Sequence, residues 1–238
     1  MTGPRVVSLV PSTTETLLAW GVDVVACTRF CEQPDLRAVG GTKDPDVDAI
    51  VALRPDVVVV NDEENRRPDA DALVEAGLVV HSCSPRSVAE VASALDDLAV
   101  AVGADPPPEL RGRAAGGEGL LDRLEPLGLR AFVPIWWRPL MSLAGDTYGS
   151  SVLDALGVVN VLADHPDRYP QVTMAEAVAA SPDVVVAPSE PYAFRPAHLA
   201  ALAEVARVVP VNGQDLFWWG VRTPAALARL HATLAPPT

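Results

Sequence analysis

The sequence predicts an α/β protein with two lobes, each built around a parallel β-sheet. Short valine-rich segments alternate with segments rich in alanine and leucine, a pattern that is typical of parallel strands covered by helices on both faces. The same ordered set of segments also occurs twice along the 238 residues. Because a repeated set of segments indicates a repeated structure, each half of the chain is expected to form its own sheet.

The first strand and the first helix of each half carry the clearest signs of this duplication. The apolar segments Val6–Pro11 and Leu129–Pro134 each read as a strand that ends at a proline. The helix that follows is expected to end at Gly21 in one half and at Gly157 in the other, because glycine is the preferred residue just beyond a helix. A further strand is expected directly after each glycine.

The third matching pair places a valine strand after a Pro-Asp dipeptide, in Arg54–Val59 and again in Ser181–Val186. We therefore expect two Rossmann-like lobes, at residues 1–103 and 129–238. The intervening residues 104–128 contain a run of three prolines, which are tolerated in a first helical turn. This stretch is expected to form a single connecting helix between the lobes.

Composition excludes several classes of partner. The chain has 18 basic and 31 acidic residues, a net charge of −13, which should repel nucleic acid and anionic membranes. Apolar runs such as Val57–Val60 are far shorter than the roughly 18 residues of a membrane span. The first expected strand begins at Arg5, which leaves no room for a signal peptide. We expect a monomer that is cytoplasmic, or extracytoplasmic if an export signal was removed.

No catalytic motif or metal-ligand pattern is present in the sequence. The three cysteines, Cys27, Cys31 and Cys83, have no second Cys or His pair to complete a metal site, so we interpret them as buried thiols. The four histidines are scattered, and neither a P-loop nor a Gly-x-Ser-x-Gly elbow occurs. The sequence therefore predicts a non-enzymatic protein without a catalytic cofactor.

Polar side chains just after the expected strands are candidates for ligand contacts, because ligands bind beyond the carboxyl ends of parallel strands. Two alternatives remain open at this stage: the Ser12–Thr14 segment also suits a helix N-cap, and the Asn61–Arg67 loop also suits a solvated charged surface. The candidates in both lobes are Ser12, Thr13, Thr42, Asn61, Glu64, Asn65, Arg66, Glu190 and Arg222.

Aromatic residues are scarce, yet they gather in the second half. Four of the five tryptophans form the adjacent pairs Trp136-Trp137 and Trp218-Trp219. Both pairs, like Tyr148 and Tyr192, are expected to follow strands. Because neighbouring residues on a strand point to opposite faces, one member of each pair is expected in the core and the other in the cleft between the lobes. Such pairs suit a flat, largely apolar ligand; core packing of both members is the alternative.

With these features the sequence resembles the class III, or helical-backbone, periplasmic binding proteins, and among them the vitamin B12-binding group. The resemblance implies two lobes joined by one helix and a corrinoid, iron–siderophore or haem ligand held between them. It further implies an ABC importer that docks on acidic residues of each lobe. The matching stretches are Arg5–Thr16, Gly41–Asp56, Glu64–Arg67, Asp146–Tyr148, Tyr169–Val172 and Trp218–Pro224.

Individual positions follow from this resemblance. Phe30 and Trp218 match aromatic ligand contacts of the B12 binders. The acidic residues expected to dock on a permease are Glu63, Glu64 and Glu190. Three positions depart from the family pattern: Asn61 and Ser82 replace tryptophans, and Arg67 replaces a docking glutamate.

The leading hypothesis is a non-catalytic binding protein for a cobalamin-like or other metal-chelate ligand, working with an ABC importer. A second hypothesis is a cytosolic carrier or chaperone that passes a cofactor to an enzyme without any transporter. A third is an enzyme of bilobal architecture, such as a chelatase or a nitrogenase-like subunit, which the absence of a Cys or His cluster disfavours.

Overall fold

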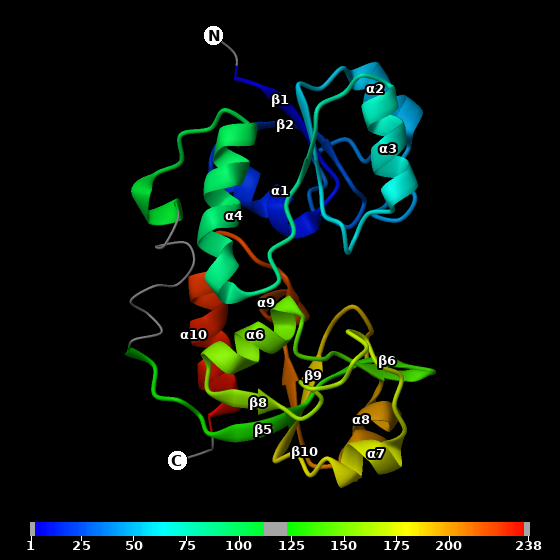
Figure 1. Cartoon of the computed structure of the whole chain (residues 1–238), viewed down its shortest axis with the longest axis vertical. Coiled ribbons are helices and arrows are strands. Elements are labelled where there is room, and N and C mark those ends of the chain that lie inside the picture. The colour runs from blue at the N-terminus through cyan, green and yellow to red at the C-terminus, as the bar shows by residue number, and fades with distance from the viewer. Residues whose placement is uncertain (1–2, 112–122, 236–238) are drawn as a thin grey trace. The chain divides into compact units, whose positions relative to one another are not determined.

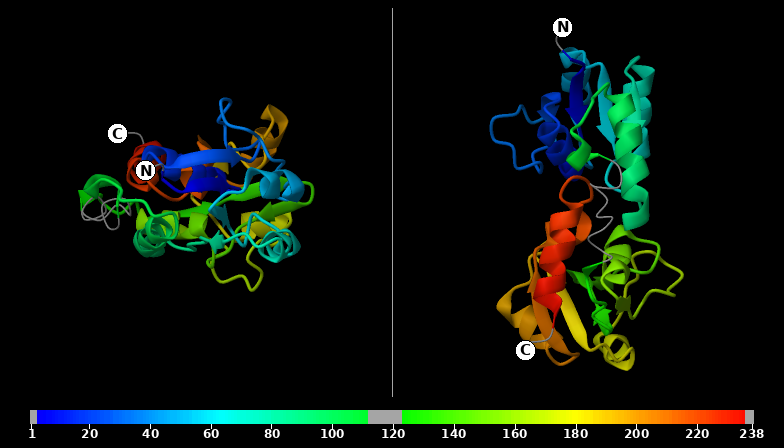
Figure 2. Two further views of the ribbon diagram at one scale, coloured as in Figure 1. Left: turned by 90° about the horizontal axis from the view of Figure 1, so that it is seen from above. Right: turned by 90° about the vertical axis from the view of Figure 1, so that its left-hand side faces the viewer.

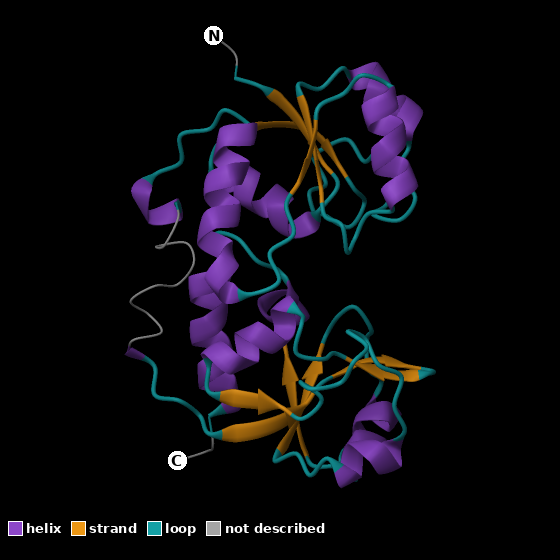
Figure 3. Cartoon of the chain, in the orientation of Figure 1, coloured by secondary structure: helices purple, strands orange, loops and turns teal. Residues whose placement is uncertain are grey.

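The computed structural model describes residues 3–111 and 123–235, and contacts divide the chain into two compact units. Unit 1 comprises Met1–Pro85, Glu90–Gly116 and Trp219–Val221. Unit 2 comprises Arg86–Ala89, Gly117–Trp218 and Arg222–Thr238. Each unit contains one four-stranded sheet, and helices flank its strands (Figures 1 and 3).

Unit 1 has the strand order β2-β1-β3-β4, and every neighbouring pair is parallel. Helices connect the strands, as parallel pairing requires. Most of α4 belongs to this unit. The elements are β1 (Arg5–Ser8), α1 (Pro11–Ala19), β2 (Asp23–Cys27), α2 (Val47–Leu53), β3 (Val57–Val60), α3 (Arg67–Glu75), β4 (Val80–Ser82), α4 (Val88–Ala101) and the short 3₁₀ helix η1 (Pro108–Leu110).

Unit 2 has the strand order β10-β9-β5-β8, again entirely parallel, and a separate antiparallel hairpin, β6-β7. Helix α10 lies beside β10 (Figure 2). The elements are β5 (Leu129–Phe132), β6 (Pro134–Trp137), β7 (Leu140–Ser142), α6 (Tyr148–Ala155), β8 (Val158–Asn160), α7 (Met174–Ala179), β9 (Val184–Pro188), α8 (Pro196–Leu202), β10 (Arg207–Val211), α9 (Gly213–Phe217) and α10 (Thr223–Leu234).

The two sheets have the same topology, which confirms the predicted fold class of two α/β lobes with parallel sheets. In unit 1 the first strand lies between the second and the third, with the fourth outermost. Unit 2 repeats this order when β5, β8, β9 and β10 are taken as its first to fourth strands. The matching sequence segments therefore occupy equivalent places in the two sheets.

Valine-rich strands are explained by burial on both faces. All four residues of Val57–Val60 are buried, as is every residue of Val184–Pro188. Val58 packs with Ile50 and Leu73 in unit 1, where α2 and α3 supply the partners. Continuous burial removes the alternation that would mark a half-exposed strand, so these segments read as unbroken apolar runs.

The predicted connecting helix falls in part on residues that the structure does not describe. Within residues 104–128 the described part contains the short helix Pro108–Leu110, and residues 112–122 lie outside the described residues. Among the described helices the longest is α4, with 14 residues, in a stretch assigned by the sequence to the first lobe. No helix in the described part of the chain is long and apolar enough to cross a bilayer.

The first helix starts two residues earlier than an N-cap at Ser12 would require. Helix α1 begins at Pro11, and its N-cap, Val10, makes no side-chain capping bond. The interpretation of the Ser12–Thr14 segment as the cap is therefore wrong, and these residues form the first turn. Proline at the first helical position fixes a suitable φ and leaves no amide to satisfy, which explains the early start.

Candidate ligand-binding site

Unit 2 carries an aromatic cluster made of Trp136, Trp137, Tyr192, Phe194 and His198. Trp136 meets Tyr192 edge-on, with ring centroids 5.0 Å apart, and Tyr192 meets Phe194 edge-on at 5.1 Å. Trp137 stacks on His198 with centroids 4.5 Å apart and an angle of 20° between the rings. Trp136 is 43 % exposed. The cluster therefore presents one large apolar ring to its surroundings while its other rings brace one another.

The hairpin β6-β7 positions both tryptophans of this cluster. Trp137 pairs with Leu140 and Trp136 with Met141 across the hairpin. Trp137 and Leu140 pack against the buried core of unit 2, whereas Trp136 points outward and its indole N–H donates to the carbonyl of Arg138 at 3.2 Å. Adjacent strand residues thus divide between the two faces of the hairpin, as strand geometry requires.

The expectation that both tryptophan pairs follow strands is wrong in detail. Trp136 and Trp137 lie on β6 itself, and Trp218 follows the short helix α9. That helix starts directly after β10 because the side chain of Asn212 accepts a hydrogen bond from the amide of Gln214. Tyr148 opens helix α6 behind a Thr147 cap, so it too does not directly follow a strand.

His198 is a member of the cluster that the sequence did not single out. Its Nδ1 accepts a hydrogen bond from the amide of Arg195 at 3.2 Å, so the proton of the neutral ring sits on Nε2. The His198 ring therefore acts as an aromatic packing partner: its Nδ1 already accepts a hydrogen bond, and one of its faces stacks on Trp137. Its position on α8, four residues after Phe194, was the only sequence signal for this role.

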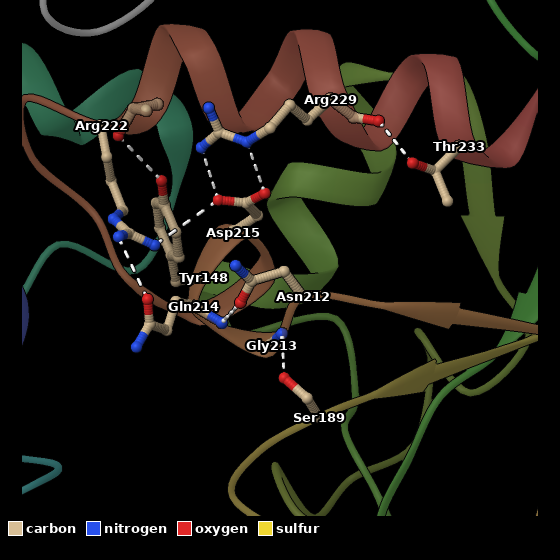
Figure 4. Close-up of polar contacts among 10 residues, drawn as sticks. Tyr148, Ser189, Asn212, Gly213, Gln214, Asp215, Arg222, Arg229 and Thr233 are labelled. Atoms are coloured by element: carbon tan, nitrogen blue, oxygen red, sulfur yellow. Dashed lines mark hydrogen bonds and ion pairs between the residues drawn. The ribbon is translucent and has the colours of Figure 1, made fainter.

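A second group in unit 2 centres on the guanidinium of Arg222 (Figure 4). The guanidinium lies 4.9 Å from the ring centroid of Trp218 and donates to the side-chain oxygen of Gln214 at 3.2 Å. Asp215 lies 3.5 Å from Arg222 and accepts two further bonds from Arg229, at 2.7 and 2.8 Å. Asp215 is buried, so two cations balance its charge and Arg222 is held against the indole face.

Two other aromatic candidates lie in the core. Trp219 is 3 % exposed and belongs by its contacts to unit 1, while its neighbour Trp218 is half-buried. Tyr148 is also buried, and its hydroxyl lies 3.2 Å from that of Thr223. Burial raises the pKa of Tyr148 to about 12. Trp219 and Tyr148 are therefore packed in the core, and their expected ligand contact stays a prediction.

Glu190, the half-buried acidic candidate of unit 2, sits against the first turn of α9. A Cβ atom on Gly213 would lie 2.4 Å from the Glu190 Cγ and 2.7 Å from its backbone nitrogen. Only glycine permits this approach. The Gly213 amide also donates to the Ser189 hydroxyl at 3.0 Å, so the loop after β9 is fixed against the start of α9.

In unit 1, the first turn of α1 contains two buried hydroxyl groups without a partner. Ser12 and Thr13 are 2 % and 0 % exposed, and within the described residues neither hydroxyl oxygen has a hydrogen-bond partner. An unpaired buried hydroxyl costs about 1–3 kcal/mol. Intrahelical bonding begins with the amide of Thr14, which donates to Val10, so the amides of Ser12 and Thr13 precede it.

Asn61 and Asn65, two predicted ligand contacts, brace the loops at the carboxyl ends of the strands. Asn65 accepts from the Asn61 amide at 2.8 Å and donates to the carbonyls of Leu9 and Thr42. Asn61 donates to the carbonyl of Cys83 and accepts from the amide of Glu63. Both side chains are buried, so their amide groups serve the loop framework, and the expected ligand contact of these two residues stays a prediction.

The remaining candidates of unit 1 lie on exposed or half-buried loops. Phe30 is 50 % exposed, and the guanidinium of Arg29 lies over its ring at 4.8 Å. Arg66 is exposed and pairs with Asp69 at 2.8 Å, a contact that raises the pKa of Arg66. The other candidates here are half-buried: Thr42, Glu63 and Glu64. The carbonyl of Glu63 accepts a bond from the Lys43 ammonium at 2.6 Å.

In the portion of the chain that the structure describes, no three or more His, Cys, Asp or Glu side chains are placed to hold a metal ion. What the two units offer is an exposed aromatic surface with a fixed guanidinium in unit 2 and unpaired hydroxyls in unit 1. The aromatic surface of unit 2 suits contact with the flat apolar body of a ligand.

Sequence comparison links the chain to curated binding proteins. It is 30 % identical over 194 residues to the vitamin B12-binding proteins of Yersinia pestis strain Pestoides F and Yersinia pseudotuberculosis serotype O:1b. The match covers 76 % of this chain and 68 % of each relative. No family model matches the chain.

Comparison with solved structures shows the same fold over nearly the whole chain. The periplasmic vitamin B12-binding protein of Vibrio cholerae superposes with a TM-score of 0.74 at 21 % identity, covering 98 % of this chain and 97 % of that one. A periplasmic heme-binding protein from Pseudomonas aeruginosa gives a TM-score of 0.77 at 22 % identity, covering 99 % and 95 %. At these sequence identities the structural similarity shows a shared fold and nothing more specific.

Proposed function

We propose that this chain, which belongs to the class III, helical-backbone family of periplasmic binding proteins, captures a corrinoid or a similar flat metal chelate for an ABC-type importer. The ligand is bound and released without chemical conversion. The observation that carries the proposal is the aromatic cluster of unit 2, in which Trp136 stays 43 % exposed although its ring contacts that of Tyr192.

An exposed indole held in one orientation is suited to a flat ligand. Burial of apolar surface yields roughly 25 cal/mol per Å², and a ring already fixed by neighbours loses little side-chain freedom when the ligand arrives. The indole N–H of Trp136 donates to the carbonyl of Arg138, so the ring can meet an apolar ligand without leaving this polar group unpaired. Trp218, backed by the Arg222 guanidinium, offers a second ring of the same kind.

Each unit, taken by itself, has polar groups of a kind that suits the side groups of such a ligand. In unit 1 the unpaired hydroxyls of Ser12 and Thr13, at a helix N-terminus, suit carbonyl or carboxylate oxygens. In unit 2 the Arg222 guanidinium suits the same acceptors. A corrinoid carries amide side groups around its ring, and amide oxygens are acceptors of this type.

A haem is the second candidate ligand, and Arg222 favours it because a guanidinium pairs well with the carboxylates of a haem. The net charge of −13 opposes an anionic ligand at long range, whereas it has little effect on a neutral corrinoid. The net charge of the chain therefore favours a neutral corrinoid over an anionic haem as the ligand. For delivery, we propose the acidic residues Glu63, Glu64 and Glu190 as contacts for the permease.

Tryptophan-fluorescence titration with cobalamin and with haem tests the proposal. Replacing Trp136 by alanine should weaken binding at least tenfold, about 1.4 kcal/mol, because the ligand loses its stacking surface. The matched control is Trp20→Phe, since the Trp20 indole donates to the carbonyl of Leu110 within unit 1, whereas the cluster belongs to unit 2. Affinity unchanged in the Trp136 variant, or reduced equally in both variants, would contradict the assignment of the aromatic surface.

A further inference from the structure

His198 links the aromatic cluster of unit 2 to the first turn of helix α8. Its ring stacks on Trp137 with centroids 4.5 Å apart, and it contacts the rings of Tyr192 at 5.7 Å and Phe194 at 6.4 Å. Trp137 and Phe194 also pack against the buried core of the unit. His198 therefore lies where the cluster, the core and the start of a helix meet.

A hydrogen bond to the backbone orients this ring. Its Nδ1 atom accepts from the amide of Arg195, the N-cap residue of α8, at 3.2 Å. An imidazole nitrogen accepts a hydrogen bond only while it carries no proton. Protonation at Nδ1 would therefore replace this bond by two N–H groups that point at each other. The bond that orients the ring is thus one that only the neutral imidazole can make.

Histidine is the side chain whose charge ordinarily changes between pH 5 and 8. The elements in contact with the ring, the hairpin β6-β7 and the loop after β9, carry the titratable or charged residues Arg138, Glu190, Tyr192 and Arg195. Side chains of these three types do not ordinarily change charge in that range. Glu190 lies against the first turn of α9, and both arginines are exposed. Within these described elements, His198 is therefore the residue that responds to a change from neutral to mildly acidic pH.

We propose that His198 is a proton-sensitive latch of the aromatic cluster. The neutral ring accepts from the Arg195 amide and stays stacked on Trp137, whereas the protonated ring gives up this bond and leaves the stack. Because Tyr192 contacts both His198 and Trp136, release of the latch also loosens the ring that supports the exposed indole. A flat ligand would then be held at neutral pH and released in mild acid, a consequence that rests on the proposed function.

One effect opposes release of the latch, because an imidazolium stacked on an indole gains a cation–π attraction. A protonated ring that kept its place, however, would hold two N–H donors against each other. Turning the ring about its Cβ–Cγ bond avoids this contact but brings a ring carbon to the Arg195 amide in place of an acceptor. The amide thus loses its partner in either orientation, and only departure of the ring lets water take that place.

NMR spectroscopy of the ligand-free whole chain tests the latch directly. Between about pH 8 and pH 5.5, we expect the His198 ring to change from the Nε2–H tautomer to the imidazolium. Its cross-relaxation with the Trp137 ring should disappear over the same range. The Arg195 amide should exchange with solvent about tenfold faster once the intrinsic pH dependence of exchange is divided out. An imidazolium that stays stacked on Trp137, or an unchanged protection of the Arg195 amide, would overturn the proposal.

Two substitutions separate the hydrogen bond from the ring. His198→Gln keeps a neutral acceptor for the Arg195 amide, as glutamine does in a capping box, and His198→Phe keeps an aromatic ring. Neither side chain takes up a proton in this range. The matched control is His165→Gln, because the Nδ1 atom of His165 also accepts from a backbone amide, that of Asp167, but its ring is outside the cluster. The same spectra show whether each variant is folded.

Titration with cyanocobalamin, whose charge is constant over this range, measures the consequence for binding. From about pH 7.5 to pH 5.5 the affinity should fall about tenfold or more in the unmodified chain and in His165→Gln, and less than about twofold in both His198 variants. Equal losses in all four proteins, or no loss in the unmodified chain, would overturn the latch and leave the proposed function standing. If cyanocobalamin binds at neither pH, the proposed function fails, and the ligand-free spectra still decide the latch.

Discussion

Polar side chains in this protein differ in whether their hydrogen bonds are already used. The side-chain amides of Asn61 and Asn65 make hydrogen bonds to backbone groups of the loops. The hydroxyls of Ser12 and Thr13 have no partner within the described structure. From the sequence, all four residues were expected after strand ends, but the sequence did not show which of them have hydrogen-bond partners within the protein. This difference depends on contacts between residues that are far apart in the chain, such as Asn65 and Leu9. No local sequence pattern encodes such contacts.

Asp215 gives the clearest energetic prediction at this scale. Replacing it by asparagine leaves the guanidiniums of Arg222 and Arg229 without their carboxylate. Because the carboxylate is buried, the free energy of unfolding should fall by about 3 kcal/mol, measured by urea denaturation. The control is Asp71→Asn, which breaks an exposed pair with Arg67 and should change the free energy of unfolding far less. Equal losses in the two variants would contradict a buried network.

At the scale of elements, the sequence predicted the strands of the two sheets well and the site elements poorly. Valine runs, and glycines that follow helices at Gly21 and Gly157, are local signals with a direct physical cause. The hairpin β6-β7 was missed because it interrupts the repeat and has no counterpart among the described elements of unit 1. Its tryptophans could be recognised as important from their rarity, but their placement on a hairpin could not.

Helix α7 offers a prediction that depends on pH. Its capping box joins Thr173 and Glu176, and bonds from the Thr173 amide and hydroxyl lower the pKa of the Glu176 carboxyl. A lowered native pKa means that this stabilisation is present above the ordinary glutamate pKa and is lost as the pH falls through the lowered value. Glu176→Gln should therefore shift the urea midpoint downward at pH 7, and the two midpoints should converge in acid. A constant difference across this range would contradict the ionic cap.

The molecule contains two sheets of the same topology, and the two units carry different sets of functional side chains. Unit 1 contributes polar loops and, among the described residues, the buried hydroxyls of Ser12 and Thr13 without partners, and unit 2 contributes the aromatic cluster and the Arg222 group. Duplication accounts for the shared framework, because matching segments build matching strands. Function rests on what differs between the copies, so the repeat that revealed the fold could not by itself reveal the site.

Isothermal titration calorimetry of the whole chain with cobalamin, haem and a ferric siderophore tests the central claim most directly. We expect saturable one-to-one binding of cobalamin with micromolar or tighter affinity, about −8 kcal/mol or more favourable, and a negative heat-capacity change from burial of the apolar ring surface. Saturation by haem alone would move the ligand assignment to the second candidate. No binding of any of the three would contradict the account of this protein as a receptor for metal chelates.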